Sequence, residues 1–540
     1  MMLSPSSRRL LVWMLPLLGL AALLRLVGIG HGLPHAAMAD DVTAGAGLIG
    51  QMLAATDGPG LLSWVSLLLA LPVMGLAWLW NGLPTGAGFE AMVAANLDIV
   101  VLIARLCATG ASLATVLLVA LIARRVFGDR LAGIAAGLLM ATSWLSVALA
   151  HSTEPWSALS FFIWLTIYIA LRYASRPGSR RAMLLGLAAG LGFGTGILGS
   201  LGLLAGLAVH LRRYRRKALN RDLALMLAPA VLLGALFGVT GAFGGSGSSG
   251  LPETAARFLE TAWWSEPVML VGGLLSLVLL LRRHGRLVGL LLGAGALWTL
   301  LAALTGAGDE GALLPLLPLL TLAAGGGALW LAEHLPLRLV RPAAGAGALV
   351  LLYPLATAGW FSLLLASSDT RELAAAWLET NLDAGSAVVI DLDPVTLPAT
   401  LDGLLDQELY LPGSLDTRMR LALEHGWPEG TSARLRALHV NRAGAQVVEG
   451  DAGRALFPLL ADAGYTTFAI ARRDDATPSG LQRAVLADYD KLALFLTSDA
   501  DDAPHAPDLN EGLLVESPVW HLFLLDRLGR SVLIARVPEG

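Results

Sequence analysis

Residues 99–125 read IVVLIARLCATGASLATVLLVALIARR. The portion at 99–123 is almost entirely apolar and is long enough to cross a bilayer, which needs about 20 such residues. The run ends in Arg124-Arg125, and short cytoplasmic loops of membrane proteins collect Arg and Lys. The stretch therefore predicts a transmembrane helix whose C-terminal end lies in the cytoplasm.

The rest of the chain shares this apolar character. Of its 540 residues, 56% are hydrophobic and 14% are charged, and the mean hydropathy is +0.67. Soluble domains are about 45–50% apolar and about 25% charged, so a soluble globular protein is excluded, as is a disordered one. A net charge of −4 gives nucleic-acid binding no electrostatic support. The single cysteine, Cys107, excludes an intramolecular disulfide and a cysteine-based zinc site.

Further apolar runs predict a protein that crosses the membrane many times. They lie near 10–28, 131–150, 155–173, 222–243, 265–281, 286–305, 312–333 and 343–365. Arginine clusters stand between them, at 8–9, 124–130, 172–181, 212–221, 282–286 and 338–341. If every cluster faces the cytoplasm, an even number of crossings separates each pair. This condition divides 182–210 into two short crossings with a turn among its glycines, and it predicts about 11 crossings with a cytoplasmic N-terminus.

The first two spans leave a large outer loop at 29–98. The apolar run at 61–80 within it cannot be a lone crossing, so it predicts a helix in the outer interface or half of a re-entrant pair. A cleaved signal peptide is the alternative for the N-terminus, because Ala37-Met38-Ala39 resembles a cleavage site. About ten residues separate the apolar run from that site, which favours a retained N-terminal span.

The chain changes character after residue 365. The net charge is −13 from Asp369 onward and +9 before it. Asp369 is a typical N-cap for the amphipathic stretch that follows. Expected strands at 387–390, 466–471, 521–525 and 532–537 alternate with expected helices at 452–463 and 479–490, which is typical of an α/β domain. The sequence thus predicts a membrane domain at 1–365 and an acidic α/β domain at 366–540 on the outer face.

Acidic residues beside membrane spans are candidates for function because charges are costly there. Asp40 and Asp41 lie just beyond the first span, and Glu154 lies between the third and fourth spans. By the predicted topology all three reach the same outer face, where a carboxylate can act as a general base or hold a metal ion. Structural explanations stay open, because Asp40 can cap a helix and Glu154 with Pro155 suits a helix start.

The basic candidates also have two interpretations each. Arg105 lies near the outer end of the second span, where it either binds an anionic lipid head group or pairs with a carboxylate. His31 and His35 flank the first loop, as metal ligands or, more commonly for such residues, as solvated loop histidines. No Walker loop follows a strand, so an ATP-driven pump has no support.

Four groups of motifs follow one another along the chain: Leu24-Arg25-Leu26 with Asp40-Asp41, Ala104-Arg105-Leu106 with the turn Arg124-Arg125-Val126-Phe127-Gly128, Glu154-Pro155, and Leu314-Pro315-Leu316-Leu317-Pro318. Taken in order, they resemble the GT-C class of integral-membrane glycosyltransferases, in the branch of bacterial protein O-mannosyltransferases and aminoarabinose transferases. The tail is similar to the outer α/β domain of many bacterial members. The resemblance implies a GT-C-like helical membrane fold followed by an extracytoplasmic α/β domain.

The resemblance also implies an activity. Members transfer a sugar from a polyprenyl-phosphate lipid to an acceptor lipid, glycan or protein, here at the outer face of the bacterial inner membrane. It implies that Asp40, paired with Asp41, activates the acceptor hydroxyl and that Glu154 positions the acceptor or a metal. Arg105 and His151 are the substrate-binding candidates. No metal ligands are assigned, and a divalent ion stays open as a cofactor.

Two departures from the family pattern favour an alternative. Gly196 and Gly311 stand where many members have a basic residue, and each charge-assisted contact is worth about 1.5–3 kcal/mol. The alternative is a catalytically inactive structural subunit of a membrane-protein complex, with the acidic tail as a docking surface. A transporter is a third interpretation, which broken helices at 182–210 would suit. Acidic sites at one outer face, rather than at mid-membrane, argue against it.

Overall fold

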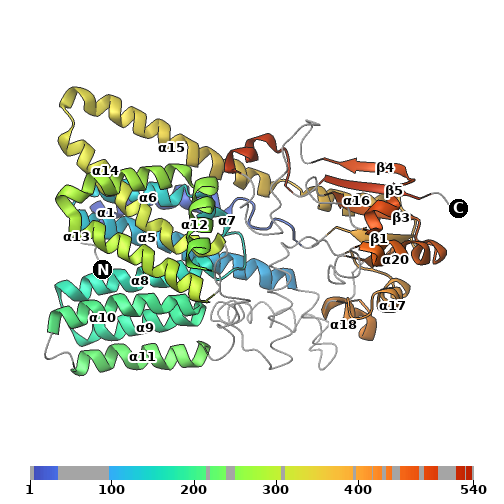
Figure 1. The fold of residues 1–540 in the computed structure, drawn as a ribbon, viewed down its shortest axis with the longest axis horizontal. Coiled ribbons are helices and arrows are strands. Elements are labelled where there is room, and N and C mark those ends of the chain that lie inside the picture. The colour runs from blue at the N-terminus through green and yellow to red at the C-terminus, as the bar shows by residue number, and fades with distance from the viewer. Residues whose placement is uncertain are drawn as a thin grey trace.

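The computed structural model describes a helical bundle followed by a region with a β-sheet (Figure 1). The described residues are 5–33, 97–214, 219–238, 250–305, 310–392, 397–415, 417–427, 433–440, 450–472, 480–496, 518–528 and 531–537. Asp40, Asp41, His35 and the run at 61–80 lie outside them. We use the name helical bundle for α1 to α15 and sheet region for α16 to β5.

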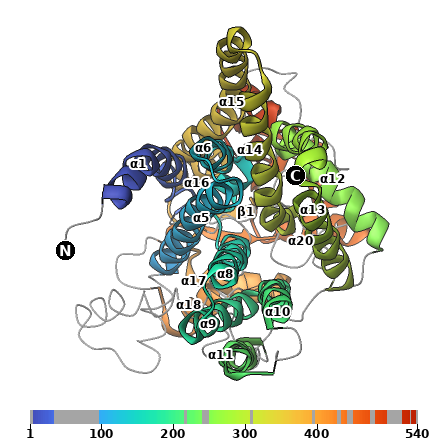
Figure 2. The ribbon, with the colours of Figure 1, turned by 90° about the vertical axis from the view of Figure 1, so that its left-hand side faces the viewer.

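The helical bundle contains the apolar runs of the sequence. Its first helices are α1 (Pro5–Leu26), α5 (Leu97–Phe127), α6 (Arg130–Ala141), α7 (Trp144–Ala148), α8 (Trp156–Ser175), α9 (Ser179–Thr195), α10 (Ser200–Tyr214) and α11 (Arg221–Gly238). The rest are α12 (Leu251–Ser265), α13 (Pro267–Thr305), α14 (Leu317–His334) and α15 (Leu337–Ala366), with 3-10 turns η1 (Ile197–Gly199) and η3 (Glu310–Leu316). Figure 2 looks along these helices, with α15 and α11 at opposite edges.

Five helical stretches among the described residues are long and apolar enough to cross a membrane. They are Val101–Phe127, Trp156–Ser175, Pro267–Thr305, Gly311–His334 and Arg341–Asn381. The chain is therefore a multi-pass membrane protein, as the apolar runs predicted. The figure of about 11 crossings stays a prediction.

The stretch at 182–210 forms two helices, α9 and α10, joined by η1. The chain turns at Gly196–Gly199, at the end of the glycine cluster from which the turn was predicted. A Cβ on Gly199 would lie 1.9 Å from the carbonyl oxygen of Gly192, so no larger residue fits this turn.

The stretches expected at 265–281 and 286–305 run together in α13. At His284, φ is −126° and ψ is 36°, which interrupts the helix within the cluster Arg282–Arg286. A straight helix of 39 residues would be about 58 Å long, nearly twice the hydrocarbon thickness of about 30 Å. The interruption leaves two portions, each near the length of a single crossing.

The sheet region begins with α16 (Thr370–Asn381), and its described residues form five strands. The strands are β1 (Ala387–Asp391), β2 (Arg436–His439), β3 (Thr467–Arg472), β4 (Asp490–Phe495) and β5 (Ser531–Arg536), in the order β2-β1-β3-β5-β4. β1 is parallel to β2 and β3, and β5 is antiparallel to β3 and β4. Between them lie α17 (Leu401–Tyr410), α18 (Thr417–His425), α20 (Gly450–Asp462), α21 (Gly480–Val485) and η5 (Val519–Leu524).

One predicted strand is wrong. Residues 521–525 belong largely to the 3-10 turn η5 and not to a strand. Val519, Leu522, Leu525 and Leu528 are buried against the core of the helical bundle, at a spacing of three residues that suits a 3-10 turn. The strand β4 at 490–495 was also missed, because the expected helix at 479–490 was extended to its first residue and no element was expected at 491–495.

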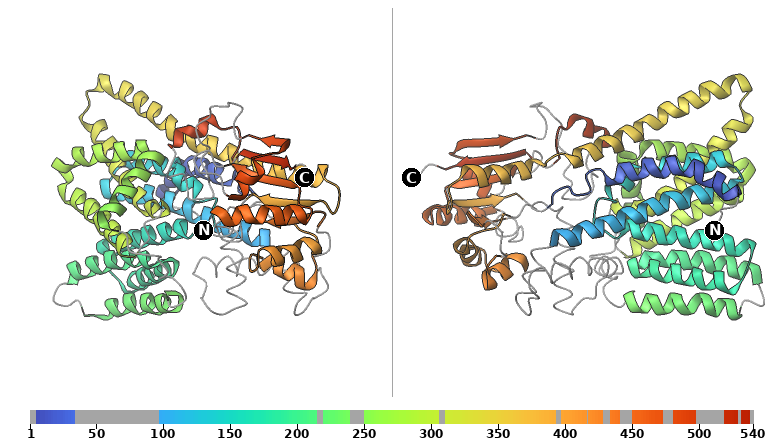
Figure 3. Two further views of the ribbon diagram at one scale, coloured as in Figure 1. Left: turned by 45° about the vertical axis from the view of Figure 1, so that its right-hand side comes forward. Right: turned by 180° about the vertical axis from the view of Figure 1, so that it is seen from behind.

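The helical bundle and the sheet region meet where α15 ends (Figure 3). α15 runs the length of the bundle and leads through residues 367–369 directly into α16. The indole Nε1 of Trp360, near the end of α15, donates to the carbonyl oxygen of Leu522 in η5 at 2.7 Å. The two regions are thus joined by hydrogen bonds as well as by the chain.

Candidate functional site

Two of the predicted site residues, Arg105 and His151, contact the segment that leaves α1, residues 27–33. Turn hydrogen bonds join the N–H of His31 to the carbonyl of Gly28 and the N–H of Leu33 to that of Gly30. Gly28 has φ of +78°, and a Cβ there would lie 2.5 Å from the Cβ of Leu365. The segment therefore packs directly on the end of α15, seven residues before Asp40.

Arg105 holds this segment from α5. Its side chain is fully buried, and its Nη1 donates to the carbonyl oxygens of Ile29 at 3.0 Å and His31 at 2.7 Å. A buried guanidinium needs such acceptors because it loses its hydration. One nitrogen of this substrate-binding candidate is therefore committed to the backbone of segment 27–33.

His151 holds the same segment from the loop between α7 and α8. Its Nε2 lies 3.0 Å from the carbonyl oxygen of Val27, and its Nδ1 lies 2.8 Å from that of Val147. Burial lowers the pKa of His151 to about 4, so the ring is neutral at pH 7 and donates to one of the two carbonyls. The ring ties the exit of α1 to α7.

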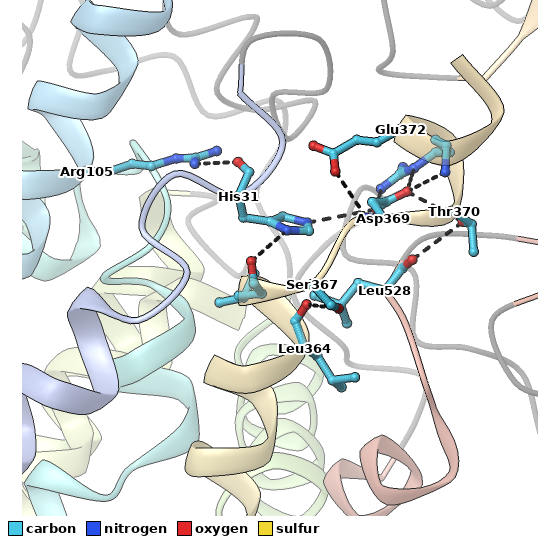
Figure 4. Close-up of polar contacts among 10 residues, drawn as sticks. His31, Arg105, Leu364, Ser367, Asp369, Thr370, Glu372 and Leu528 are labelled. Carbon is cyan, nitrogen blue, oxygen red and sulfur yellow. Dashed lines mark hydrogen bonds and ion pairs between the residues drawn. The ribbon is translucent and has the colours of Figure 1, made fainter. Parts of the chain in front are cut away.

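His31 is buried and not solvated, so the solvated-loop interpretation is wrong for this residue. Its Nδ1 lies 3.1 Å from the carbonyl oxygen of Leu365, and its Nε2 lies 3.9 Å from Oδ2 of Asp369 (Figure 4). Burial lowers the pKa of His31 to about 4. The neutral ring therefore donates from Nδ1 to α15, which adds a third anchor to segment 27–33.

Glu154 lies three residues after His151 in the same loop. It is half-buried, its N–H donates to Oγ of Ser152 at 3.3 Å, and it directly precedes Pro155, the N-cap of α8. The loop thus brings Glu154 to the end of the helical bundle where α1 exits. Its predicted partners Asp40 and Asp41 lie outside the described residues.

Gly196 and Gly311 occupy different surroundings. A Cβ on Gly311 would lie 2.2 Å from Cδ1 and 2.3 Å from Nε1 of Trp156, so the indole fills the space that a side chain would need. A Cβ on Gly196 would meet only Cδ1 of Leu159, at 4.0 Å. The indole of Trp156, which follows Glu154-Pro155, therefore occupies the space that a side chain at position 311 would fill.

A second buried polar cluster was missed by the sequence reasoning, which quoted Arg25 in a motif without a role. Arg25 is fully buried in α1 and makes five hydrogen bonds. Its nitrogens donate to Oγ of Ser112 and Ser146 and to the carbonyl oxygens of Ala21, Met140 and Ala141. All five N–H groups of a guanidinium can be satisfied in this way, so the charge is held by protein alone.

The opposite charge in this cluster comes from Glu266, between α12 and α13. Its carboxylate accepts from Oγ of Ser143 at 2.6 Å and from the N–H of Leu145 at 2.9 Å. Ser143 in turn accepts from the N–H of Ser146, whose hydroxyl bonds to Arg25. The signal for this cluster was available, since charged residues inside or between apolar runs are costly unless paired.

The described residues give no metal site. Among them, no group of three or more His, Cys, Asp and Glu side chains is placed to hold a metal ion. A site built on Asp40 or Asp41 would fall outside this set, so the divalent ion stays a prediction.

Residues 91–239 match the model of the dolichyl-phosphate-mannose-protein mannosyltransferase family. The match spans α5 to α11 and includes Arg105, His151, Glu154 and Gly196. The resemblance to GT-C membrane glycosyltransferases that the motifs predicted is confirmed over this part of the chain. No curated protein sequence matches the chain.

Two solved structures of ArnT from Cupriavidus metallidurans are similar to the chain. The one bound to undecaprenyl phosphate has 12% identity and a TM-score of 0.43, covering 98% of this chain and 98% of that one. The one in the apo state has 13% identity and a TM-score of 0.46, covering 97% and 98%. These values are too low to transfer the role of any residue.

Proposed function

We propose that the chain transfers a sugar from a polyprenyl-phosphate lipid to an acceptor at the outer face of the bacterial inner membrane. The observation that carries the proposal is the anchoring of segment 27–33, which leads to Asp40-Asp41, by Arg105 and His151 and by its own His31, which contacts α15. The match over residues 91–239 supports the reaction class. The acceptor class stays a lipid, glycan or protein.

The chemistry needs a base on one side of the anomeric carbon and charge neutralisation on the other. In our proposal Asp40 takes the proton of the acceptor hydroxyl, and the acceptor oxygen forms the new bond to the anomeric carbon. The bond from that carbon to the phosphate oxygen breaks, and the polyprenyl phosphate leaves with the electron pair. Asp41 and Glu154 orient the acceptor.

Arg105 and His151 take a positioning role in this proposal. Both hold main-chain carbonyl groups of segment 27–33, so they set where the loop toward Asp40 begins. Direct contact of either residue with substrate stays a prediction.

The proposed orientation follows from the arginine clusters. α15 begins, with Arg338 and Arg341, at the end of the bundle away from the sheet region, and it ends beside that region (Figure 1). If basic ends face the cytoplasm, the sheet region lies outside. We propose that 1–365 and 366–540 are the membrane domain and the extracytoplasmic domain.

The test is Asp40→Asn, with the exposed acid Asp462→Asn in α20 as the matched control. Purified protein is given radiolabelled undecaprenyl-phosphate sugars (hexose and pentose) and bacterial inner-membrane lipids as acceptors. We expect transfer by Asp40→Asn to fall about 10²- to 10⁴-fold, since general-base catalysis contributes this much, while Asp462→Asn keeps the wild-type rate. A wild-type rate in Asp40→Asn would show that the base is misassigned.

One observation favours the alternative of an inactive structural subunit. The indole of Trp156 fills the space beside Gly311, where a basic residue would bind phosphate in the implied family pattern. This alternative predicts no transfer by the wild-type protein with any donor tested. It also predicts stoichiometric partner proteins after gentle detergent extraction.

A further inference from the structure

One carboxylate joins the ends of four helices, α8, α9, α10 and α11, which lie together in the bundle (Figure 2). Asp222, in the first turn of α11, accepts a hydrogen bond from one hydroxyl group of each of the other three helices. The donors are Tyr173 of α8 at 3.2 Å, Ser179 of α9 at 2.8 Å and Tyr214 of α10 at 3.0 Å. The hydroxyl of Tyr173 also lies 3.0 Å from Nδ1 of His210, which is buried in α10. These contacts fix the four helix ends relative to one another, and we call them the basic end.

Arginines crowd the basic end. The described residues of 172–181, 211–214 and 219–222 include seven arginines. Asp222 is the one acid among these described residues, and three hydroxyl groups bind it. Six of the arginines are exposed, namely Arg172, Arg176, Arg180, Arg212, Arg213 and Arg221. The basic end therefore presents a strong positive charge to its surroundings.

The partner of Arg172 does not neutralise its charge. Its Nη1 donates to the hydroxyl of Tyr168 at 3.1 Å, and its Cζ lies 5.8 Å from the centre of that ring. In the cluster 282–286, by contrast, Arg283 pairs with the carboxylate of Glu333. The basic end thus differs from that cluster in keeping charge for an external anion.

Apolar side chains lie directly beside these charges. Met183 and Leu184 are exposed on α9, three and four residues after Arg180. Leu211 is exposed on α10 and directly precedes Arg212. In a chain that crosses the membrane, an arginine next to exposed apolar residues is suited to the boundary between hydrocarbon and headgroups. A phospholipid has the matching arrangement, with a phosphate above its acyl chains, whereas a free anion would use the arginines alone.

We propose that the basic end binds the headgroup of an anionic phospholipid, with the acyl chains against α9 and α10. Guanidinium groups bind phosphate oxygens through paired N–H donors, and basic pockets between membrane helices bind such headgroups. Because Asp222 holds the four helix ends together, arginines from different helices converge on one headgroup. In the proposed orientation the lipid belongs to the cytoplasmic leaflet. The site lies at the opposite end of α8 from Glu154 and does not depend on the proposed transferase activity.

The test measures lipid binding to the full-length protein in a neutral detergent by native mass spectrometry. The lipids are dioleoyl phosphatidylglycerol and the zwitterionic dioleoyl phosphatidylethanolamine. The variant is Arg212→Gln with Arg213→Gln, and its control is Arg338→Gln with Arg341→Gln, which removes the same charge from exposed arginines at the start of α15. We expect phosphatidylglycerol affinity to fall about 30-fold in the variant, since each arginine near an anionic headgroup contributes about fivefold, and to stay near wild type in the control.

Two outcomes would overturn the proposal. The first is equal wild-type affinity for the two lipids, because recognition would then not involve the anionic charge. The second is an equal loss of phosphatidylglycerol affinity in both double variants, because the attraction would then be a general property of basic surface. Arg176→Gln with Arg180→Gln serves if the first variant does not fold, since it removes the same charge from the ends of α8 and α9. We expect a similar loss of affinity, and wild-type affinity in this variant would also reject the site.

Inorganic phosphate in large excess identifies the source of the anion. We expect phosphatidylglycerol to stay bound, because its acyl chains contact exposed apolar residues of α9 and α10 and phosphate has none. Displacement of the lipid by phosphate would assign the arginines to a free anion and reject a lipid site.

Discussion

The helical bundle and the sheet region are held together by different kinds of contact. In the bundle, large apolar side chains point outward, as at Val278 and Leu349, which are 69% and 68% exposed. Small residues let its helices approach closely, and buried charges lie inside it. In the sheet region, Val388, Ile390 and Ile534 are almost fully buried between the sheet and its helices.

The difference follows from the solvent of each region. Lipid tails are as apolar as leucine, so burying an apolar side chain gains little between membrane helices, and close packing and polar contacts specify the arrangement. In water, burial of apolar area is the main stabilising term. Substitutions that remove a polar contact should therefore be most damaging in the bundle.

The largest expected effect comes from Arg25→Met in the bundle. The substitution removes the five hydrogen bonds that Arg25 donates to buried acceptors, and each buried acceptor left unpaired costs about 1–3 kcal/mol. We expect a clear fall in Tm of the detergent-purified protein, measured by tryptophan fluorescence.

The matched control is Arg283→Met, which removes an exposed arginine that pairs with Glu333 in the same bundle. Exposed pairs contribute about 0–1 kcal/mol, so Tm should hardly change. An Arg25→Met protein as stable as Arg283→Met would show that the cluster does not stabilise the bundle.

The next effect concerns pH and lies in the sheet region. His439 is buried at the end of β2, its Nε2 lies 3.1 Å from the carbonyl oxygen of Leu397, and burial lowers its pKa to about 4 from 6.5. Between these two values the unfolded state binds the extra proton, so stability falls as pH drops from 6.5 to 4. The loss amounts to about 3 kcal/mol at pH 4 and below.

We expect His439→Gln to flatten this pH dependence, because Gln keeps a donor for Leu397 and does not titrate. The readout is hydrogen exchange of the β1 and β2 amides between pH 4 and pH 7, corrected for the intrinsic rates. Following these strands excludes the contributions of His31 and His151, which are buried where α1 exits. If stability depends on pH in the same way in the wild type and in His439→Gln, His439 is not the source of that dependence.

The smallest expected effect comes from Gly325→Ala, which tests close packing in the bundle. A Cβ on Gly325 of α14 would lie 2.5 Å from the carbonyl oxygen of Ala132 in α6, so Gly325→Ala must push the two helices apart. Overpacking of this kind costs about 1–3 kcal/mol. Gly345→Ala on α15 meets nothing within 4 Å and should lose no stability. Equal Tm values for the two variants would contradict the packing argument.

Apolar run length was enough to predict the five long apolar helices among the described residues, because a helix in lipid must be apolar over a fixed length. Asp369 was predicted as an N-cap, and the structure shows it accepting from the first turn of α16. The error at 521–525 has a tertiary cause, since those residues pack on the bundle and not in the sheet. Local pattern cannot reveal such a partner.

Some features of the candidate site could also be predicted from the sequence, and others are visible only in the structure. The sequence singled out Arg105, His151 and Glu154 because each carries a polar or charged group beside an apolar run. It could not show that Arg105 and His151 both bind main-chain carbonyls of segment 27–33, because a carbonyl acceptor leaves no mark on residue type. The approach of His31 to Asp369, at 3.9 Å, joins residues 338 positions apart and was equally invisible.

By itself, then, the sequence determined that the chain crosses the membrane repeatedly, that an acidic region with alternating strands and helices follows, and where charges interrupt apolar runs. Those properties depend on composition and periodicity, which are local. The tertiary structure alone decided which buried charges meet, that Trp156 fills the space at Gly311, and that His31 in the segment leaving α1 lies beside Asp369 at the start of α16. Those properties depend on the positions of backbone atoms brought together from distant parts of the chain.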